Sequence, residues 1–259
     1  MNCHMTHIGT ATVLLEIGPI RLLTDPVFDP PGGNYHFGYG TSSKKLASPA
    51  MRPEDIGKVN AILLSHDHHE DNLDRSGRAF LPNARQVLTT MAGARRLDGH
   101  AIGLKSWQST TIKSDGLEIK VTAVPARHGS LGSHWIVGET TGFVLEWPGQ
   151  KHGALYISGD SVWFKGIREI TEHFRIGTAI LHIGRASFPS TGLVWFTFSA
   201  KEAVRVVKAL QPQSVIPIHY EGWKHFREPR AQAERVFLTA GIQDKVHWLP
   251  LGEPVDMEI

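Results

Sequence analysis

Cysteine is almost missing from this chain, since Cys3 is the single cysteine among 259 residues. One cysteine cannot form an intramolecular disulfide, and the lack of a C-x-x-C pair excludes both a thiolate zinc knot and a dithiol redox pair. The sequence therefore excludes a disulfide-stabilised scaffold. Any metal centre must be built from histidine and carboxylate side chains.

Long hydrophobic runs and an excess of one charge are missing as well. The longest apolar stretches, such as 12–15 and 61–64, are far shorter than the ~18 residues of a transmembrane helix, and no basic start precedes an apolar core at the N-terminus. With 27 Lys and Arg against 25 Asp and Glu, the basic residues form no stripe that could follow a phosphate backbone. We expect a cytoplasmic protein that binds neither a membrane nor nucleic acid.

The chain has enough length and apolar content for one large domain over residues 1–259, with 41% hydrophobic residues. Two β-rich runs, 10–17 and 20–24, are separated by Gly18 and Pro19, a pattern that predicts a hairpin. Most later apolar runs lack strict alternation, which is typical of strands buried on both faces. These later strands are predicted at 61–64, 118–124, 142–147, 154–157, 178–183 and 214–218.

Helices are predicted at 84–98, 199–210 and 229–240. Ser199 and Glu202 have the spacing of a capping box at the start of the second helix. Strands and helices alternate in both halves of the chain, so we predict a single α/β domain whose sheets are covered by helices.

The densest polar cluster, SHDHHEDNLD at 65–74, directly follows the apolar strand 61–64. Three histidines and four acidic residues occur within nine positions, and such side chains suit Zn²⁺, Mn²⁺ or Fe²⁺. The end of a strand holds ligands more rigidly than a free loop does. A solvated charged turn is the alternative explanation.

Three further apolar strands each run into one residue of ligand type, namely His128, Asp160 and His219. Taken singly, each of these is more typical of a cap or a turn. In open α/β architectures, however, ligands gather beyond the carboxyl ends of strands, so these ends can converge on one site.

Several segments resemble the metallo-β-lactamase-fold hydrolases over most of the chain. They are HIGTATVL at 7–14, LTDPVF at 23–28, the histidine cluster, and IHY at 218–220. The two opening segments and PARH at 125–128 further resemble the branch that holds N-acylphosphatidylethanolamine phospholipase D and the ascorbate-6-phosphate lactonases. The resemblance implies a four-layer αββα sandwich with one or two divalent metal ions at one edge of the sheets.

The H-x-H-x-D-H cluster of that family can be aligned with this sequence in two registers. In the first, His66 and His68 match, but a glutamate takes the place of the aspartate. In the second, one extra residue follows His66, and His69, Asp71 and Asn72 occupy the positions of the second histidine, the aspartate and the last histidine. We prefer the second register because it keeps the aspartate.

The second register implies a set of metal ligands. His66, His69 and His128 would bind the first metal, Asp71 and His219 the second, and Asp160 would bridge them, with His68 as a substitute ligand. Asn72 offers an amide where the family has an imidazole, which predicts a weaker second site or a harder ion. Zinc and manganese are the expected metals.

Such a site predicts a metal-dependent hydrolase that cleaves an ester, lactone or phosphoester bond with a metal-bound hydroxide, which Asp71 orients or relieves of its proton. The substrate is expected to be a small molecule, an anionic one included, and a homo-oligomer is compatible with the sequence. The Asn72 departure indicates an alternative, a non-hydrolytic metal-binding or regulatory protein on the same scaffold.

Other residues have both a functional and an ordinary interpretation. His182 and Arg185 follow another strand end, where Arg185 could hold an anion or be a surface residue. His225 is a candidate for the rim of the pocket. The stretch 26–43 is rich in Pro, Gly and aromatic residues and too long for a turn, so it is either a functional lid or a flexible excursion.

Overall fold

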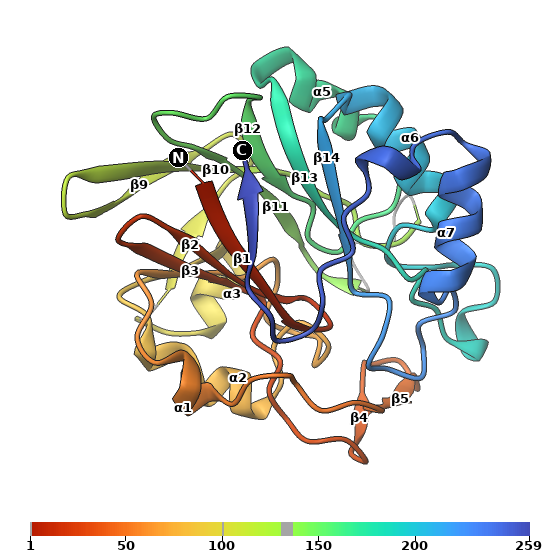
Figure 1. The fold of residues 1–259 in the computed structure, drawn as a ribbon. Coiled ribbons are helices and arrows are strands. Elements are labelled where there is room, and N and C mark those ends of the chain that lie inside the picture. Colours follow the sequence, from red (N-terminus) through yellow and green to blue (C-terminus); the bar gives the residue numbers. More distant parts are fainter. Residues whose placement is uncertain (1, 100, 131–136) are drawn as a thin grey trace.

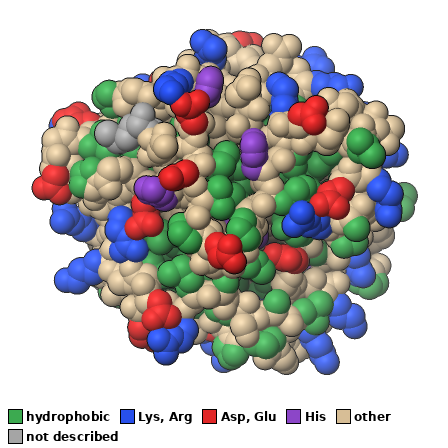
Figure 2. All heavy atoms as spheres, in the orientation of Figure 1, with side chains coloured by type: hydrophobic (Ala, Val, Ile, Leu, Met, Phe, Trp, Pro, Cys, Tyr) green, Lys and Arg blue, Asp and Glu red, His purple; other side chains and the backbone are tan. Residues whose placement is uncertain are grey.

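The computed structural model describes residues 2–99, 101–130 and 137–259. Two β-sheets pack face to face, and helices cover the outer face of each sheet (Figure 1). This is the four-layer αββα arrangement that the family resemblance implied. On the face shown in Figure 2, basic and acidic side chains lie interspersed, in keeping with the small net charge.

The first sheet has the strand order β15-β1-β2-β3-β6-β7-β8. The predicted hairpin is confirmed, because β2 and β3 pair antiparallel and Ile17 lies opposite Ile20 across the turn. From β3 onward the strands run parallel. The strands are β1 (Asn2–Gly9), β2 (Thr12–Ile17), β3 (Ile20–Thr24), β6 (Ala61–Leu63), β7 (Val87–Thr90), β8 (Ala101–Leu104) and β15 (Val255–Glu258).

The second sheet has the order β14-β13-β12-β11-β10-β9. β12, β13 and β14 are parallel, and β10 points the same way because β11 is antiparallel to both β10 and β12. The carboxyl ends of four strands therefore share one edge. The strands are β9 (Ser109–Ser114), β10 (Leu117–Pro125), β11 (Thr141–Glu146), β12 (Ala154–Ile157), β13 (Ile176–His182) and β14 (Ser214–Ile218).

Apolar side chains from both sheets form one buried cluster between them. Leu15 and Leu63 of the first sheet belong to it together with Phe143 and Ile180 of the second. Because burying apolar surface contributes roughly 25 cal/mol per Å², this interface holds the two sheets, and hence their shared edge, together.

The helices complete the outer layers. In α6 the predicted capping box is present, since Ser199 accepts from the backbone of Glu202 and the Glu202 side chain accepts from Ser199. None of the helices among the described residues combines the length and hydrophobicity needed to cross a membrane. The helices are α1 (Pro53–Ile56), α2 (Arg75–Phe80), α3 (Met91–Arg96), α5 (Gly166–His173), α6 (Ala200–Leu210) and α7 (Arg230–Thr239), with 3₁₀ turns at Leu81–Asn83, Pro189–Thr191 and Gln243–Lys245.

The prediction of one helix over 84–98 is wrong. Val87–Thr90 forms the fully buried strand β7 between β6 and β8, and the short helix α3 follows it. The strand ends and the helix begins at Thr90, because its hydroxyl caps α3 by accepting a hydrogen bond from the backbone N–H of Gly93. Pairing with the neighbouring strands β6 and β8 thus determines the conformation of this short run of β-favouring residues, although the sequence pattern around it is helical.

The stretch 26–43 is ordered into a small hairpin, which pairs β4 (Asn34–His36) with β5 (Ser42–Lys44). Directly after it, the ammonium of Lys45 lies 2.9 Å from the carboxylate of Asp74, and both side chains are buried. Asp74 also accepts from the backbone of Asp29 and caps α2. This ion pair ties the hairpin to the segment that follows the histidine cluster.

We expect Lys45→Ala to lower the free energy of unfolding by about 3–5 kcal/mol, because it leaves the charge of Asp74 buried without its counter-charge. Urea unfolding at neutral pH measures the change. Lys44→Ala, at an exposed neighbouring position, should stay within about 0.5 kcal/mol of the parent. Equal losses in the two variants would show that the buried pair contributes nothing of its own.

Candidate metal centre

The candidate site lies where strands of both sheets end. His66 follows β6 in the first sheet, whereas His128, Asp160 and His219 follow β10, β12 and β14 in the second, and His182 is the last residue of β13. All five side chains are buried. The fold therefore brings together the strand ends on which the sequence prediction rested.

One group of imidazoles consists of His66, His69 and His128. The Nδ1 atom of His69 lies 3.1 Å from Nε2 of His66 and 2.9 Å from Nε2 of His128. An ion with metal–nitrogen bonds of 2.0–2.1 Å in tetrahedral geometry would hold such atoms about 3.3 Å apart. Burial lowers the pKa of all three histidines, which favours the neutral imidazole, the form that binds a metal ion.

A second group consists of Asp160, His182 and His219, whose ligand atoms lie within 4.8 Å of one another. Oδ1 of Asp160 is 2.9 Å from Nδ1 of His182 and 3.5 Å from Nε2 of His219. The other oxygen of Asp160 lies 4.0 Å from Nε2 of His66, and Oδ2 of Asp71 lies 3.5 Å from Nε2 of His219. Asp160 thus stands between the two groups.

The charges of the second group depend on one another. Burial by itself raises the pKa of Asp71 and Asp160, but the neighbouring histidines hold the pKa of both carboxyls well below the usual value. Burial likewise lowers the pKa of His219, yet Asp160 and Asp71 raise it to about 9. The two buried carboxylates are therefore stabilised by positive charge next to them, which His219 or a metal ion can supply.

Unpaired polar atoms show that the site fits metal ions. Oδ1 of Asp71, Nε2 of His182 and both ring nitrogens of His219 are buried without a hydrogen bond from any described residue. Buried polar atoms are rarely left in this state. Imidazole and carboxylate donors that converge in this way suit divalent ions of the zinc and manganese type.

The structure does not bring His68 into either group. Its Nε2 donates to the carbonyl of Val137 at 2.6 Å, and the ring lies beside the Asp67–Arg96 ion pair. His69, the residue favoured by the register with one extra residue, takes the place beside His66.

Asn72 and Asp25 support the site from behind. The Asn72 amide lies 3.3 Å from Oδ1 of Asp160, and it also donates to Oγ of Ser65. That hydroxyl contacts Asp25 at 2.9 Å and Nδ1 of His66 at 2.9 Å. Such outer partners fix the orientation of ligating side chains. His182, which sequence reasoning noticed at a strand end but did not assign as a ligand, places an imidazole beside Asp160.

His219 is held in a backbone conformation that side chains rarely adopt, with φ at 63°. Its N–H donates to the carbonyl of Thr10 at 2.8 Å. Gly184 makes room for it, because a Cβ there would lie 2.4 Å from the His219 carbonyl oxygen. Strain of this kind persists where the surroundings over-determine it, which is common at functional sites.

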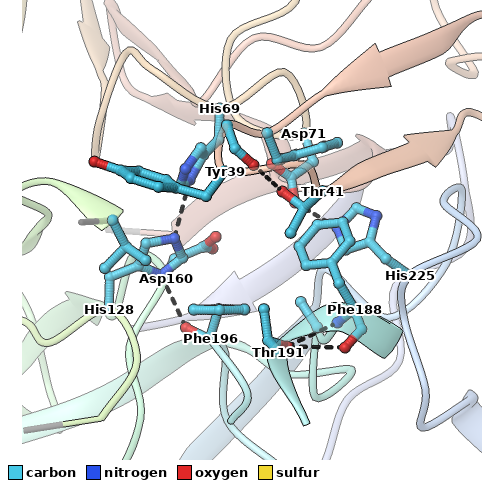
Figure 3. Close-up of a pocket in the computed structure, with 14 residues that line it drawn as sticks. Tyr39, Thr41, His69, Asp71, His128, Asp160, Phe188, Thr191, Phe196 and His225 are labelled. Carbon is cyan, nitrogen blue, oxygen red and sulfur yellow. Dashed lines mark hydrogen bonds and ion pairs between the residues drawn. The ribbon is translucent and has the colours of Figure 1, made fainter. Parts of the chain in front are cut away.

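A cavity of about 80 Å³ opens onto both groups (Figure 3). His69, Asp71, His128, Asp160 and His225 face it, and most of its other lining side chains are aromatic or apolar. No Lys or Arg is among the described residues that line it. The remaining lining residues are Phe37, Gly38, Tyr39, Thr41, Val137, Ala186, Phe188, Thr191 and Phe196.

Two residues that the sequence placed near the site have now been located. Arg185, the candidate for holding an anion, stacks over the ring of Trp195 at 4.9 Å and does not line the cavity. His225 does line it, and its Nε2 lies 2.9 Å from Oδ2 of Asp71.

The sequence matches known proteins along most of its length. Residues 20–220 match the beta-lactamase superfamily domain. Over 243 residues the chain is 34% identical to a UPF0173 metal-dependent hydrolase of Thermococcus onnurineus (strain NA1), which covers 93% of this chain and 94% of that protein. A UPF0173 metal-dependent hydrolase of Pyrococcus furiosus is 26% identical over 254 residues, with 98% and 99% covered.

Solved structures share the fold. An isothiocyanate hydrolase from Delia radicum gut bacteria superposes with a TM-score of 0.81 at 23% identity, over 100% of this chain and 99% of that chain. A possible metal-dependent hydrolase from Veillonella parvula DSM 2008 gives 0.82 at 18% identity, over 98% and 99%. At these identities the likeness establishes the fold alone.

We expect His69→Ala to lose bound metal more severely than His68→Ala, because His69 shares the first group with His66 and His128 whereas His68 hydrogen-bonds to Val137. Elemental analysis after dialysis against a weak chelator measures metal per chain. Greater metal loss from His68→Ala would favour the other register of the cluster.

Proposed function

Because the chain belongs to the UPF0173 metal-dependent hydrolases of the beta-lactamase superfamily, we propose that it hydrolyses an ester or lactone bond in a small, uncharged substrate that carries an apolar group. The observation that carries this proposal is the cavity, in which two groups of metal-type ligands face walls of aromatic side chains. Ligands and walls converge on one small space.

Each group of ligands would hold one divalent ion. His66, His69 and His128 are all imidazoles, which suits zinc, whereas the group around Asp160 includes carboxylate and suits zinc or manganese. His182 and His219 would be the imidazole ligands of that second ion. Bound there, such ions lower the pKa of water to about 7 and polarise a carbonyl oxygen.

Asp71 is the candidate catalytic carboxylate. Its Oδ2 is held by His225, and its Oδ1 is buried, faces no hydrogen-bond donor among the described residues and lies in a side chain that borders the cavity. Oδ1 can therefore accept a hydrogen bond from the attacking water and orient that water toward the substrate.

The walls of the cavity favour an uncharged substrate. Phe37, Phe188 and Phe196 offer apolar surface, and the charged residues that line the described part of the cavity are Asp71 and Asp160, both acidic. An anionic substituent would thus find no cationic side chain there. We therefore place carboxylic esters and lactones ahead of phosphoesters, which the resemblance to the phospholipase branch had put on an equal footing.

A second candidate substrate class is the isothiocyanates. The structural neighbour from Delia radicum gut bacteria is named an isothiocyanate hydrolase. An isothiocyanate is also small and uncharged and presents an electrophilic carbon beside an apolar group, so the same cavity would accept it.

We expect metal-loaded protein to turn over phenyl acetate, dihydrocoumarin or benzyl isothiocyanate with a kcat/KM at least about tenfold above that for bis(4-nitrophenyl) phosphate, a difference of about 1.4 kcal/mol. Steady-state assays with and without a chelator measure this. Activity should vanish with the chelator and return with Zn²⁺ or Mn²⁺. A preference for the phosphodiester, or activity that ignores the chelator, would contradict the proposal.

We expect Phe188→Leu to raise KM for phenyl acetate about 2–10-fold, because an aromatic contact contributes about 0.5–1.5 kcal/mol beyond its area. Methyl acetate, which has no ring, should be affected much less. Leu238→Ala, at an exposed position on α7, is the matched control and should leave both substrates unchanged. Equal changes in KM for the two esters would rule out a wall that recognises the apolar group.

A further inference from the structure

A chain of three buried side chains runs from the small hairpin to the candidate catalytic carboxylate. Oγ of Ser43 lies 2.7 Å from Nδ1 of His225, and Nε2 of His225 lies 2.9 Å from Oδ2 of Asp71. His225 belongs to neither group of converging metal-type ligands. Its two ring nitrogens are instead both engaged in hydrogen bonds.

The direction of these hydrogen bonds follows from what each atom can do. An ionised carboxylate can accept but not donate, so Nε2 of His225 must carry a proton and donate it to Asp71. In the neutral ring Nδ1 is then the acceptor, and the hydroxyl of Ser43 donates to it. Asp71 thereby selects the tautomer of His225, and the hydroxyl of Ser43 stabilises that tautomer by donating to Nδ1.

Aromatic packing fixes the plane of the His225 ring. Phe188 stacks on it with a ring separation of 4.9 Å and an interplanar angle of 12°, and Phe37 packs against it at 4.9 Å. Both phenylalanines also line the cavity. A ring held in this way presents Nε2 to Asp71 in one direction and leaves little freedom for the carboxylate to rotate.

Ser43 is placed by the same hairpin that walls the cavity. It lies on β5, and the turn between β4 and β5 contributes Tyr39 and Thr41 to the lining. The buried pair of Lys45 and Asp74 anchors the end of this hairpin. Only a few backbone residues separate Ser43 from the part of the cavity wall that Tyr39 and Thr41 form, so a shift of the hairpin would move both.

We propose that Ser43 and His225 are positioning residues that hold Asp71 with its Oδ1 toward the cavity, so that the β4–β5 hairpin sets the orientation of the catalytic carboxylate as well as the shape of the substrate wall. This rests on the proposed function in so far as Asp71 is catalytic. The hydrogen-bonded chain itself is independent of the substrate.

Kinetics of the metal-loaded protein test the positioning role. His225→Ala should lower kcat about 10–100-fold, the usual cost of losing an outer partner of a site, with a smaller change in KM. His225→Gln keeps an N–H donor and should recover kcat to within about threefold of the parent, with the metal content of the parent at saturation. Loss of one metal per chain in His225→Gln, or no recovery in a variant that melts like the parent, would overturn the proposal.

Ser43→Ala tests the tautomer without touching the histidine or the metal ligands. Two-bond ¹H–¹⁵N NMR spectra of the zinc-loaded protein report which ring nitrogen of His225 carries the proton. We expect the proton on Nε2 in the parent and in Ser42→Ala, whose exposed serine is the neighbour on β5, and a shift of population toward Nδ1 in Ser43→Ala. A proton on Nδ1 alone in the parent, or no change in Ser43→Ala, would overturn the proposal.

These spectra require no turnover, so they separate the two ideas. If the parent hydrolyses none of the offered substrates while the His225 tautomer responds to Ser43→Ala as expected, the proposed function fails and the positioning chain stands. If the parent is active and the tautomer ignores Ser43→Ala, the positioning chain fails alone.

Discussion

The arrangement of the site depends on one constraint, which is that the carboxylate of Asp160 is buried between the two sheets and its charge must be compensated. An ionised carboxylate away from water is tolerated only with matching positive charge and hydrogen bonds. Here His182 at the end of β13 and His219 after β14 contact the carboxylate, and the Asn72 amide adds a contact from the segment that follows β6. Loading this position with divalent ions satisfies the same demand, so charge balance and metal binding are one requirement.

Several local features serve this requirement. His219 is kept at a positive φ by its backbone contact to Thr10 and by the space that Gly184 leaves. The apolar interface between the sheets, in which Leu63 and Ile180 take part, holds the strand ends in register. The strained backbone of His219 and the packing of the core thus both fix side chains at one edge of the sandwich. The candidate substrate cavity opens at that edge.

Much of the fold follows from sequence patterns. The hairpin of β2 and β3, the buried strands of the second sheet and the capping box of α6 all lie where local chemistry predicted them. The helix predicted over 84–98 fails because Val87–Thr90 is short, rich in β-branched residues and compatible with a buried strand. What decides its state is pairing with β6 and β8, residues distant in sequence. The resemblance to the phospholipase and lactonase branch remains a prediction.

The candidate site divides in the same way. The sequence by itself indicated that a metal centre would use histidine and carboxylate, since one cysteine excludes a cluster of thiolate ligands, and that strand ends supply them. The register with one extra residue already favoured His69 over His68 as a ligand. Tertiary structure alone decided that His68 bonds to Val137, and that His182 and His225 join Asp160 and Asp71. These contacts depend on which strands and loops pack against one another, and that packing is not encoded in local spacing.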